Sequence, residues 1–205
     1  MDIINELDTF LELKNAEDAK EHDEPKDNEF FASSALYCPR KVQWEKHNEV
    51  EYEGETLRKF LIGNLLHDYL QNNIFIESKG FKNEVRYVLE DGDISVRGRV
   101  DVESEDEVIE IKSIARLPKD KLEHHIAQVG IYMRITGKKG KILYIEKIGG
   151  NIIEFDVDKE EGDIACEKAL RLFHQIYSAD VKGEEAPGEK TWLCRFCKNV
   201  ECEYK

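Results

Sequence analysis

The sequence has no long apolar run, no secretory signal and no excess of basic residues. The 205-residue chain contains no stretch of about eighteen apolar residues, so we predict that no segment crosses a membrane. Residues 1–14 lack the basic and then apolar order of a signal peptide, which indicates a cytoplasmic protein. The formal net charge is −14, the opposite of the basic surface that nucleic-acid-binding proteins usually present. The length is typical of one compact domain with its own core.

The acidic charge is concentrated at the amino-terminal end. Residues 1–29 contain eleven acidic and three basic side chains, a balance of −8, so the rest of the chain carries −6. Helical spacing of apolar residues predicts a helix over residues 3–14, and the charged stretch 15–29 is typical of a linker. We therefore divide the chain into an acidic helix and linker, residues 1–29, and a main domain, residues 30–205. Small basic clusters remain, each more often solvated surface than a phosphate contact: Arg40 with Lys41, Arg58 with Lys59, Arg97 with Arg99, and Lys138 with Lys139 and Lys141.

The five cysteines are odd in number, and a disulfide framework is not expected in a chain without an export signal. Cys194, Cys197 and Cys202 form C-x2-C-x4-C at the carboxyl end, while Cys38 lies far upstream in L-Y-C-P-R-K. Free thiols in this pattern favour a metal centre, and a structural zinc ion with four cysteine ligands is one interpretation. Cys166 differs, because it shares a helical face with apolar residues and is expected to be a buried small side chain.

Hydrophobic periodicity indicates a helical front, a strand-rich middle and a helical return. Ser33 or Ser34 is an N-cap candidate for a short helix that carries Cys38. Longer helices are predicted over residues 56–73, 118–136 (opened by Pro118) and 159–179. Strands are predicted over residues 83–89, 94–103, 108–114, 141–147 and 152–157, with a hairpin turn at residues 104–107. This order of elements predicts an α/β fold.

The predicted hairpin carries candidate catalytic residues. Alternation along the strands places Asp101 on one face of its strand, with Arg97 and Arg99, and places Glu110 and Lys112 together on one face of the next. Hydrolysis of a phosphodiester requires such groups, because carboxylates hold Mg²⁺ or Mn²⁺ and a lysine orients the attacking water or neutralises developing charge. A surface hairpin with outward-facing charged residues is the alternative interpretation.

Two helical features extend this pattern. His67 lies on the predicted helix before the hairpin, and Gln128 and Tyr132 project from one face of the helix after it. Taken in order, four motifs over roughly residues 60–135 resemble the RecB-like branch of the PD-(D/E)xK nuclease superfamily: His67, G-x-x-D from Gly98 to Asp101, E-x-K from Glu110 to Lys112, and Q-x-x-x-Y from Gln128 to Tyr132. Val100 stands where the name of the superfamily expects a proline.

This resemblance implies a restriction-endonuclease-like core, in which helices flank a mixed central sheet, with a helical, cysteine-clustered side region. The metal ligands that it implies are His67, Asp101, Glu110 and the carbonyl group of Ile111. Lys112 would then act on the attacking water, and Gln128 and Tyr132 would position the lysine or the DNA strand.

One cysteine upstream and three downstream of a RecB-like core resembles the iron–sulfur nucleases, namely the CRISPR-associated Cas-four exonucleases and the AddB-type recombination nucleases. The resemblance implies a four-iron, four-sulfur cluster held by Cys38, Cys194, Cys197 and Cys202. It also implies a Mg²⁺- or Mn²⁺-dependent exonuclease on single-stranded or frayed DNA ends. Such an enzyme would act beside CRISPR integrase proteins in spacer acquisition, or beside recombination proteins in recombination and repair. A catalytically inactive, cluster-bearing module that binds DNA or protein is the alternative function.

Overall fold

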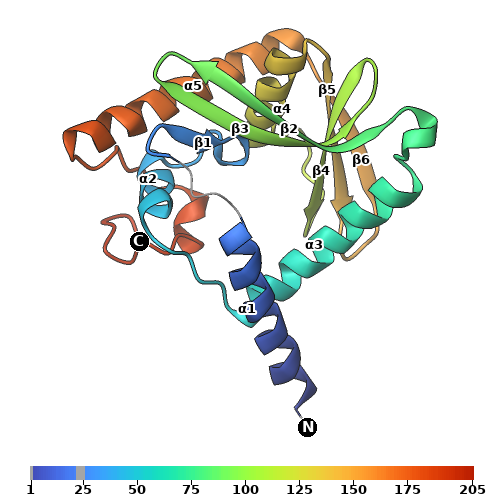
Figure 1. The fold of residues 1–205 in the computed structure, drawn as a ribbon, viewed down its shortest axis with the longest axis horizontal. Coiled ribbons are helices and arrows are strands. Elements are labelled where there is room, and N and C mark those ends of the chain that lie inside the picture. Colours follow the sequence, from blue (N-terminus) through green and yellow to red (C-terminus); the bar gives the residue numbers. More distant parts are fainter. Residues whose placement is uncertain (1, 22–25) are drawn as a thin grey trace.

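A computed structural model describes residues 2–21 and 26–205 of the chain. Figure 1 shows a twisted sheet with helices packed around it. The helices are α1 Ile3–Glu21, α2 Pro39–His47, α3 Gly54–Asn73, α4 Glu123–Thr136 and α5 Lys159–Lys182. The strands are β1 Glu29–Phe31, β2 Lys82–Asp91, β3 Ile94–Glu103, β4 Glu107–Ile114, β5 Lys139–Glu146 and β6 Ile152–Val157. Short 3-10 turns lie at Ala32–Ser34, Glu77–Lys79 and Trp192–Arg195.

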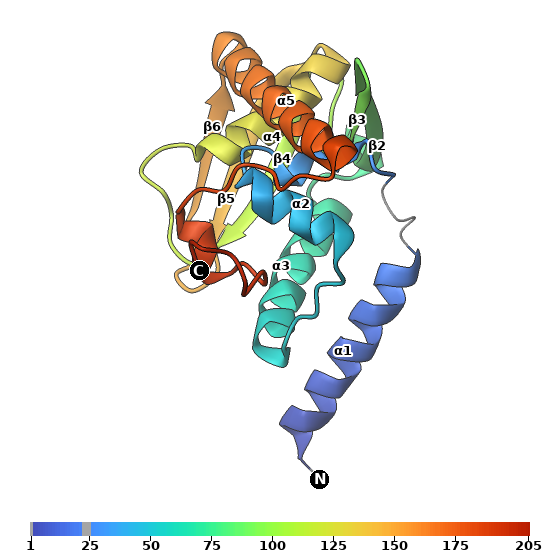
Figure 2. The ribbon, with the colours of Figure 1, turned by 90° about the vertical axis from the view of Figure 1, so that its left-hand side faces the viewer.

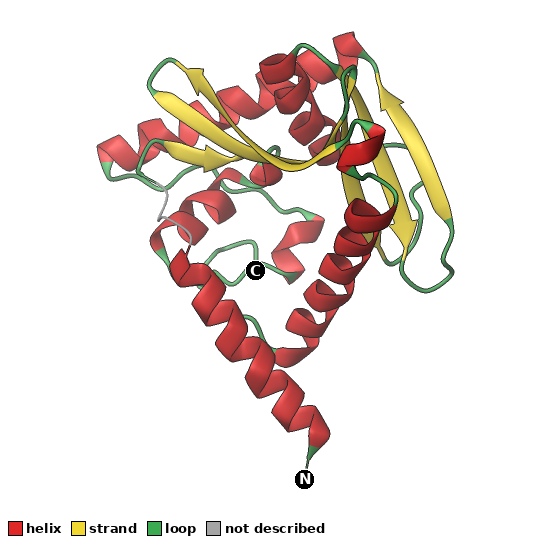
Figure 3. Cartoon of the chain, turned by 45° about the vertical axis from the view of Figure 1, so that its right-hand side comes forward, coloured by secondary structure: helices red, strands yellow, loops and turns green. Residues whose placement is uncertain are grey.

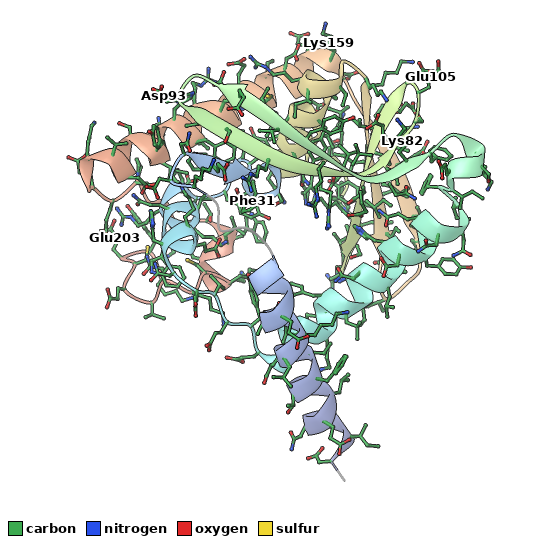
Figure 4. All side chains as sticks on the ribbon, viewed as in Figure 1. Phe31, Lys82, Asp93, Glu105, Lys159 and Glu203 are labelled. Carbon is green, nitrogen blue, oxygen red and sulfur yellow. The ribbon has the colours of Figure 1, made fainter. Side chains whose placement is uncertain are left out.

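β3 is the central strand of the sheet. It pairs with β2 in antiparallel fashion at every residue except Asp101, and the turns at Asp93 and Glu105 lie at its two ends (Figure 4). Its other edge pairs in parallel with β1 at residues 95–97 and in antiparallel fashion with β4 at residues 102–103. β4 continues in parallel to β5, and β5 in antiparallel fashion to β6. This mixed sheet, flanked by helices, confirms the predicted α/β class.

Two hydrophobic cores pack against the sheet. In the larger core, Val100 of β3 lies with Ile131 of α4 and Phe173 of α5. In the smaller core, Ile111 of β4 packs with Leu66 of α3. β4 contributes Val108 to the larger core and Ile111 to the smaller one, as expected for an internal strand with alternating side chains. Polar side chains on β4 must consequently find partners inside the protein.

α4 crosses α5 at very short range. A Cβ atom built on Gly130 would lie 2.3 Å from the carbonyl oxygen of Gly162, so only glycine permits this approach. Gly137 ends α4 with a left-handed φ of 70°, and Gly183 ends α5 in the same way with a φ of 67°. This contact holds α4, which carries Gln128 and Tyr132, against the body of the fold.

The predicted start of α4 is wrong. The helix begins at Glu123, whereas Pro118 lies in the loop before it. The backbone N–H of Leu122 donates to the Tyr144 hydroxyl over 3.1 Å, and this tertiary hydrogen bond holds the loop in an extended path. Local propensity at a proline could not reveal this bond.

Two boundaries near the amino-terminal end also differ from the prediction. α1 continues to Glu21 through part of the expected linker, and residues 22–25 of that linker lie outside the described residues. α2 begins at Pro39 with Cys38 at its N-cap, so neither Ser33 nor Ser34 caps it. Proline suits the first position of a helix, because that position needs no N–H donor.

The division expected between residues 29 and 30 passes through β1. Glu29 is buried, and one of its carboxylate oxygens accepts a hydrogen bond from Arg97 Nη2 over 2.7 Å. Phe30 is also buried, and its ring stacks on Phe173 with 4.7 Å between centroids. The sheet therefore includes Glu29.

α1 leans on α3 at the edge of the molecule (Figure 1). Asp8 pairs with Arg58 of α3, and Leu11 is buried in the contact. Of the helices in residues 2–21 and 26–205, none is long and apolar enough to cross a membrane.

Candidate active site and cysteine lobe

An open stretch of β3 marks the candidate active site. In the described part of the chain, residues 98–101 lack a strand partner on one edge, because β1 ends opposite Arg97 and β4 first pairs at Val102. The sheet consequently divides into two arms, which Figure 3 shows as two separate groups of strands. Backbone N–H and C=O groups along such a gap need partners other than a strand.

Side chains from α3 and α4 supply these partners. The Tyr132 hydroxyl donates to the carbonyl of Arg99 over 3.1 Å, and the Gln71 amide donates to the carbonyl of Asp101 over 2.8 Å. From the other side of the gap, the N–H of Ile111 donates to Asp101 Oδ2 over 2.7 Å. The N–H and C=O of one strand residue point to the same edge, so the Ile111 carbonyl also points into the gap.

Gly98 allows Tyr132 to reach this position. A Cβ atom at Gly98 would lie 2.3 Å from Cε1 of the Tyr132 ring. The G-x-x-D motif therefore needs a glycine at this position, because a side chain there would clash with the Tyr132 ring. The linear motif did not reveal this steric requirement.

Glu110, Lys112 and Gln128 form a buried hydrogen-bonded triangle. Glu110 Oε1 accepts from Lys112 Nζ over 2.7 Å and from Gln128 Nε2 over 2.8 Å. Lys112 Nζ also donates to Gln128 Oε1 over 2.9 Å. Glu110 is only 3% exposed, and its Oε2 has no hydrogen-bond partner among the described residues. A buried oxygen without a partner costs on the order of 1–3 kcal/mol, a cost that a bound cation would remove.

The acid–base properties of the site follow from burial and mutual repulsion. Burial, assisted by the nearby charge of Glu84, raises the pKa of Asp101 to about 6. Burial also raises the pKa of Glu110 to about 7, with the charge of Asp101 adding to this effect. Burial opposes the charge of Lys112, but the ion pair with Glu110 outweighs it and raises the pKa of Lys112. Two carboxylates whose charges repel each other form a site that attracts a cation.

His67 of α3 faces the same carboxylate. Its Nδ1 lies 3.8 Å from Asp101 Oδ2, and burial lowers its pKa, which leaves the imidazole neutral and able to bind a metal. Within the residues that the structure describes, no three His, Cys, Asp or Glu side chains converge closely enough for one metal ion. Instead, one carboxylate oxygen of Glu110 is paired with the Lys112 ammonium group. The set of four metal ligands therefore stays a prediction.

Glu84 of β2 also lies beside the site. It lies on β2 between Asn83 and Val85, which pair with β3, and it has a left-handed φ of 57°, which is rare for this residue type. Its carboxylate accepts from Gln71 Nε2 over 2.7 Å and lies 2.5 Å from Arg99 Nε. Gln71 thus links Glu84 to the Asp101 backbone.

The four predicted cluster cysteines line one cavity, together with the basic residues Arg40, Lys41 and Lys205: Cys38, Cys194, Cys197 and Cys202. We call residues 188–205 with Cys38 the cysteine lobe. Figure 2 shows this carboxyl-terminal segment running beside α2, and the Arg40 N–H donates to the carbonyl of Pro187 over 3.2 Å. Basic side chains around four thiols suit a centre with anionic thiolate ligands.

Cys166 lies elsewhere, as predicted. It is fully buried in the larger core, and burial raises the pKa of its thiol. A thiol in this environment is unreactive.

The motif pattern did not include His124 and His125, which lie at the start of α4 near Lys112. His125 is buried and shares a hydrogen bond of 2.9 Å with the hydroxyl of Tyr144, the residue in register with Lys112 on the next strand. Burial, and then the charge of Lys112, lowers the pKa of His124 to about 4 and that of His125 to about 2. His124 lies one helical turn before Gln128, and this spacing was the available signal.

The basic clusters found in the sequence are largely engaged with acids. The ion pairs include Arg97 with Glu29, Arg99 with Glu84, Arg58 with Asp8, and Lys138 with Glu103. These residues therefore do not form a free phosphate-binding surface.

Comparison with known proteins places the fold. No protein-family profile and no curated protein matches the chain. The solved structure of SSO0001 matches with a TM-score of 0.68 and 22% identity, over 95% of both chains. A candidate exonuclease from Eubacterium rectale matches with a TM-score of 0.60 and 12% identity, over 87% of this chain and 90% of that one. LHK-Exo in complex with dAMP matches with a TM-score of 0.52 and 13% identity, over 75% of this chain and 90% of that one. The chain thus shares its fold with exonuclease-like structures.

Proposed function

We propose that the protein is a divalent-metal-dependent DNA exonuclease that acts on single-stranded or frayed DNA ends. The observation that carries this proposal is the buried Oε2 of Glu110, which has no hydrogen-bond partner among the described residues and lies beside Asp101 and Lys112. Carboxylate oxygens are the ligands that Mg²⁺ and Mn²⁺ prefer. The fold shared with a candidate exonuclease and with LHK-Exo, which was solved with dAMP, supports a nucleic-acid substrate.

Each residue of the gap has a role in this proposal. The residues that would hold the cation are His67, Asp101, Glu110 and, through its carbonyl, Ile111. A bound cation would stabilise charge on the phosphate and lower the pKa of the attacking water. Lys112 would orient that water, and Gln128 fixes the lysine by accepting one of its hydrogen bonds. Tyr132 in turn accepts a hydrogen bond from Gln128 over 3.0 Å.

The cysteine lobe would hold a four-iron, four-sulfur cluster through Cys38, Cys194, Cys197 and Cys202. Its role would be structural, because it would join α2 to the carboxyl-terminal segment. The biological setting that we propose is CRISPR spacer acquisition with integrase proteins, or recombination and repair with recombination proteins. Co-purification with either set of proteins would separate these two settings.

Substitution of the triangle tests the proposed activity. Glu110→Gln and Lys112→Ala should each reduce Mn²⁺-dependent degradation of end-labelled single-stranded DNA by about 100-fold or more, because each removes a group that acts on the cation or the water. Glu154→Gln is a matched control, because Glu154 is 67% exposed in its side chain and lies on the edge strand β6.

Degradation at the wild-type rate by a folded Glu110→Gln protein would show that the assignment is wrong. Undiminished degradation by the wild-type protein after complete removal of divalent cations would also exclude the proposed mechanism. A melting curve for each variant separates loss of activity from loss of fold.

A further inference from the structure

Four aromatic rings form a row that runs from Tyr37 through His124 of α4 to the cysteine lobe. His124 lies between Tyr37, 5.6 Å away, and Trp192, 5.8 Å away, measured between ring centroids. Trp192 then meets Phe196 edge to face, with 6.0 Å between centroids. Trp192 is 55% exposed and Phe196 is 62% exposed, so the outer half of this row is open to solvent.

The short turn at Trp192–Arg195 explains why these two rings point outward. Leu193 and Cys197 are four residues apart and are each 8% exposed, so they face the interior of the lobe. Trp192 and Phe196 have the same spacing, one position earlier, and face solvent. Thr191 caps the turn by accepting from the Leu193 N–H over 3.3 Å, which holds this arrangement.

A second set of contacts leads from His124 to the face of the sheet that carries Lys112. His124 lies 4.1 Å from His125, measured between ring centroids, and His125 shares a hydrogen bond with Tyr144. Tyr144 stands in register with Lys112 on the neighbouring strand β4. His125 and Tyr144 are buried, so these contacts fix the position of the exposed rings relative to the strand that carries Lys112.

The chain segment that carries the two exposed rings is basic. Residues 190–198 contain three basic residues, Lys190, Arg195 and Lys198, and no acidic residue, although the whole chain has a net charge of −14. None of the three forms an ion pair with another described residue, in contrast to the predicted basic clusters. Free cations beside exposed rings are the combination that binds the phosphates and bases of a single strand.

We propose that Trp192, Phe196 and His124 form a stacking platform for the bases of single-stranded DNA, which guides the strand to Lys112. This inference rests on the proposed nuclease function and specifies the form of its substrate. Bases of any sequence have an apolar face that can stack on an aromatic ring, so the platform would bind without sequence preference. Lys190, Arg195 and Lys198 would contact the phosphates on either side.

Binding of a fluorescent oligothymidylate, measured by anisotropy in buffer without divalent cations, tests the platform. Trp192→Leu keeps an apolar side chain but removes the ring, so it should weaken binding by about fivefold to 100-fold. Trp192→Phe keeps a ring and should stay within about threefold of the wild type. Tyr69→Leu is the matched control, because Tyr69 is a 65% exposed aromatic residue on α3, and it should bind like the wild type.

A strand of equal length without bases separates stacking from charge. The wild-type protein should bind this abasic strand more weakly, and Trp192→Leu should bind it as the wild type does. An equal effect of Trp192→Leu on both strands, or wild-type affinity of the folded variant for oligothymidylate, would overturn the platform. An equally large effect of Tyr69→Leu would also overturn it.

Hydrolysis of thymidine 5′-(p-nitrophenyl phosphate) distinguishes failure of the platform from failure of the nuclease. This small diester needs only the metal site, so Trp192→Leu should hydrolyse it at the wild-type rate. If the wild type hydrolyses neither DNA nor the small diester, but Trp192→Leu still binds the strand with bases more weakly, the nuclease proposal fails and the platform stands. If hydrolysis occurs and Trp192→Leu binds DNA normally, the nuclease stands and the platform fails.

Discussion

Asp101 is a buried carboxylate that contributes to both the fold and the candidate site. It is 8% exposed, and it accepts the N–H of Ile111 where β3 and β4 separate. The same oxygen lies 3.8 Å from His67 Nδ1. A charge in this position is unfavourable without a cation, which makes the stability of the metal-free protein sensitive to pH.

We predict that Asp101→Asn removes part of this pH dependence. Folding raises the pKa of Asp101 from 3.8 to about 6. The protonated carboxyl group therefore contributes its full stabilisation below about pH 4, and this stabilisation is lost as the pH rises through about 6. Between about pH 5 and about pH 8, the free energy of unfolding of the metal-free wild type should fall by on the order of 1–3 kcal/mol more than that of the asparagine variant. Urea denaturation of both proteins at the two pH values measures this difference.

Manganese provides the control for Asp101→Asn. At about pH 8, Mn²⁺ should raise the melting temperature of the wild type and leave that of the variant almost unchanged, because a ligand stabilises only the state that binds it. Identical pH dependence of the two metal-free proteins would contradict the assigned burial effect.

α4 is the element that organises the candidate site. His124, Gln128 and Tyr132 recur at every fourth position and lie along one side of the helix. Between them in sequence, Gly130 contacts the backbone of Gly162 in α5. The position of the site residues therefore depends on a helix crossing that has no catalytic group of its own.

We predict a large effect of alanine at Gly130 and a small effect at Gly162. Gly130→Ala places its Cβ 2.3 Å from a backbone oxygen that cannot move locally, so it should destabilise the protein by about 1–3 kcal/mol and reduce cleavage. Gly162→Ala places its Cβ 3.1 Å from the flexible Met133 sulfur, and helix propensity offsets the contact. Its stability should stay within about 1 kcal/mol of the wild type.

Chemical denaturation with parallel cleavage assays measures both variants. Equal destabilisation by the two substitutions would show that the crossing is looser than described.

At the scale of the whole molecule, the end of the chain returns to α2. Arg40 of α2 donates to the carbonyl of Ala186 over 3.1 Å and pairs with Glu203 over the same distance. Cys38 directly precedes α2 and faces the cavity lined by the three carboxyl-terminal cysteines. A metal centre there would close a loop that contains strands β2 to β6.

We predict that Cys38→Ser loses the metal centre as completely as Cys197→Ser. Protein prepared without oxygen should absorb broadly at about 400 nm through charge transfer to iron, and both variants should lose this absorbance. The free energy of unfolding should fall on the order of 4–5 kcal/mol if the centre acts like a crosslink over so long a loop.

Cys166→Ala is the matched control, because this buried thiol lies in the larger core and should leave the absorbance intact. A colourless protein with one equivalent of zinc would replace the iron–sulfur cluster but keep the closure. A Cys38→Ser protein that keeps the full metal content would refute the closure.

Much of the candidate site was predictable from the sequence, because its signals are local. Alternation along a strand placed Glu110 and Lys112 on one face, and helical spacing placed Gln128 and Tyr132 on another. The structure brings these four residues together, and it buries Cys166 as predicted. Their chemical roles stay predictions.

Only the tertiary structure decided which part of β3 stays open and what fills it. The gap exists because β1 pairs with residues 95–97 and β4 with residues 102–103, and these partners come from opposite sides of β3 in the sequence. Gln71 reaches the gap through a hydrogen bond to the backbone carbonyl of Asp101, and Glu84 lies beside it with a left-handed φ. Neither feature has a periodic signal in the sequence. Strand and helix periodicity records how a residue faces its own element. Contacts between distant elements depend on how those elements pack, so the open edge and the row of rings beside it emerge only in the folded chain.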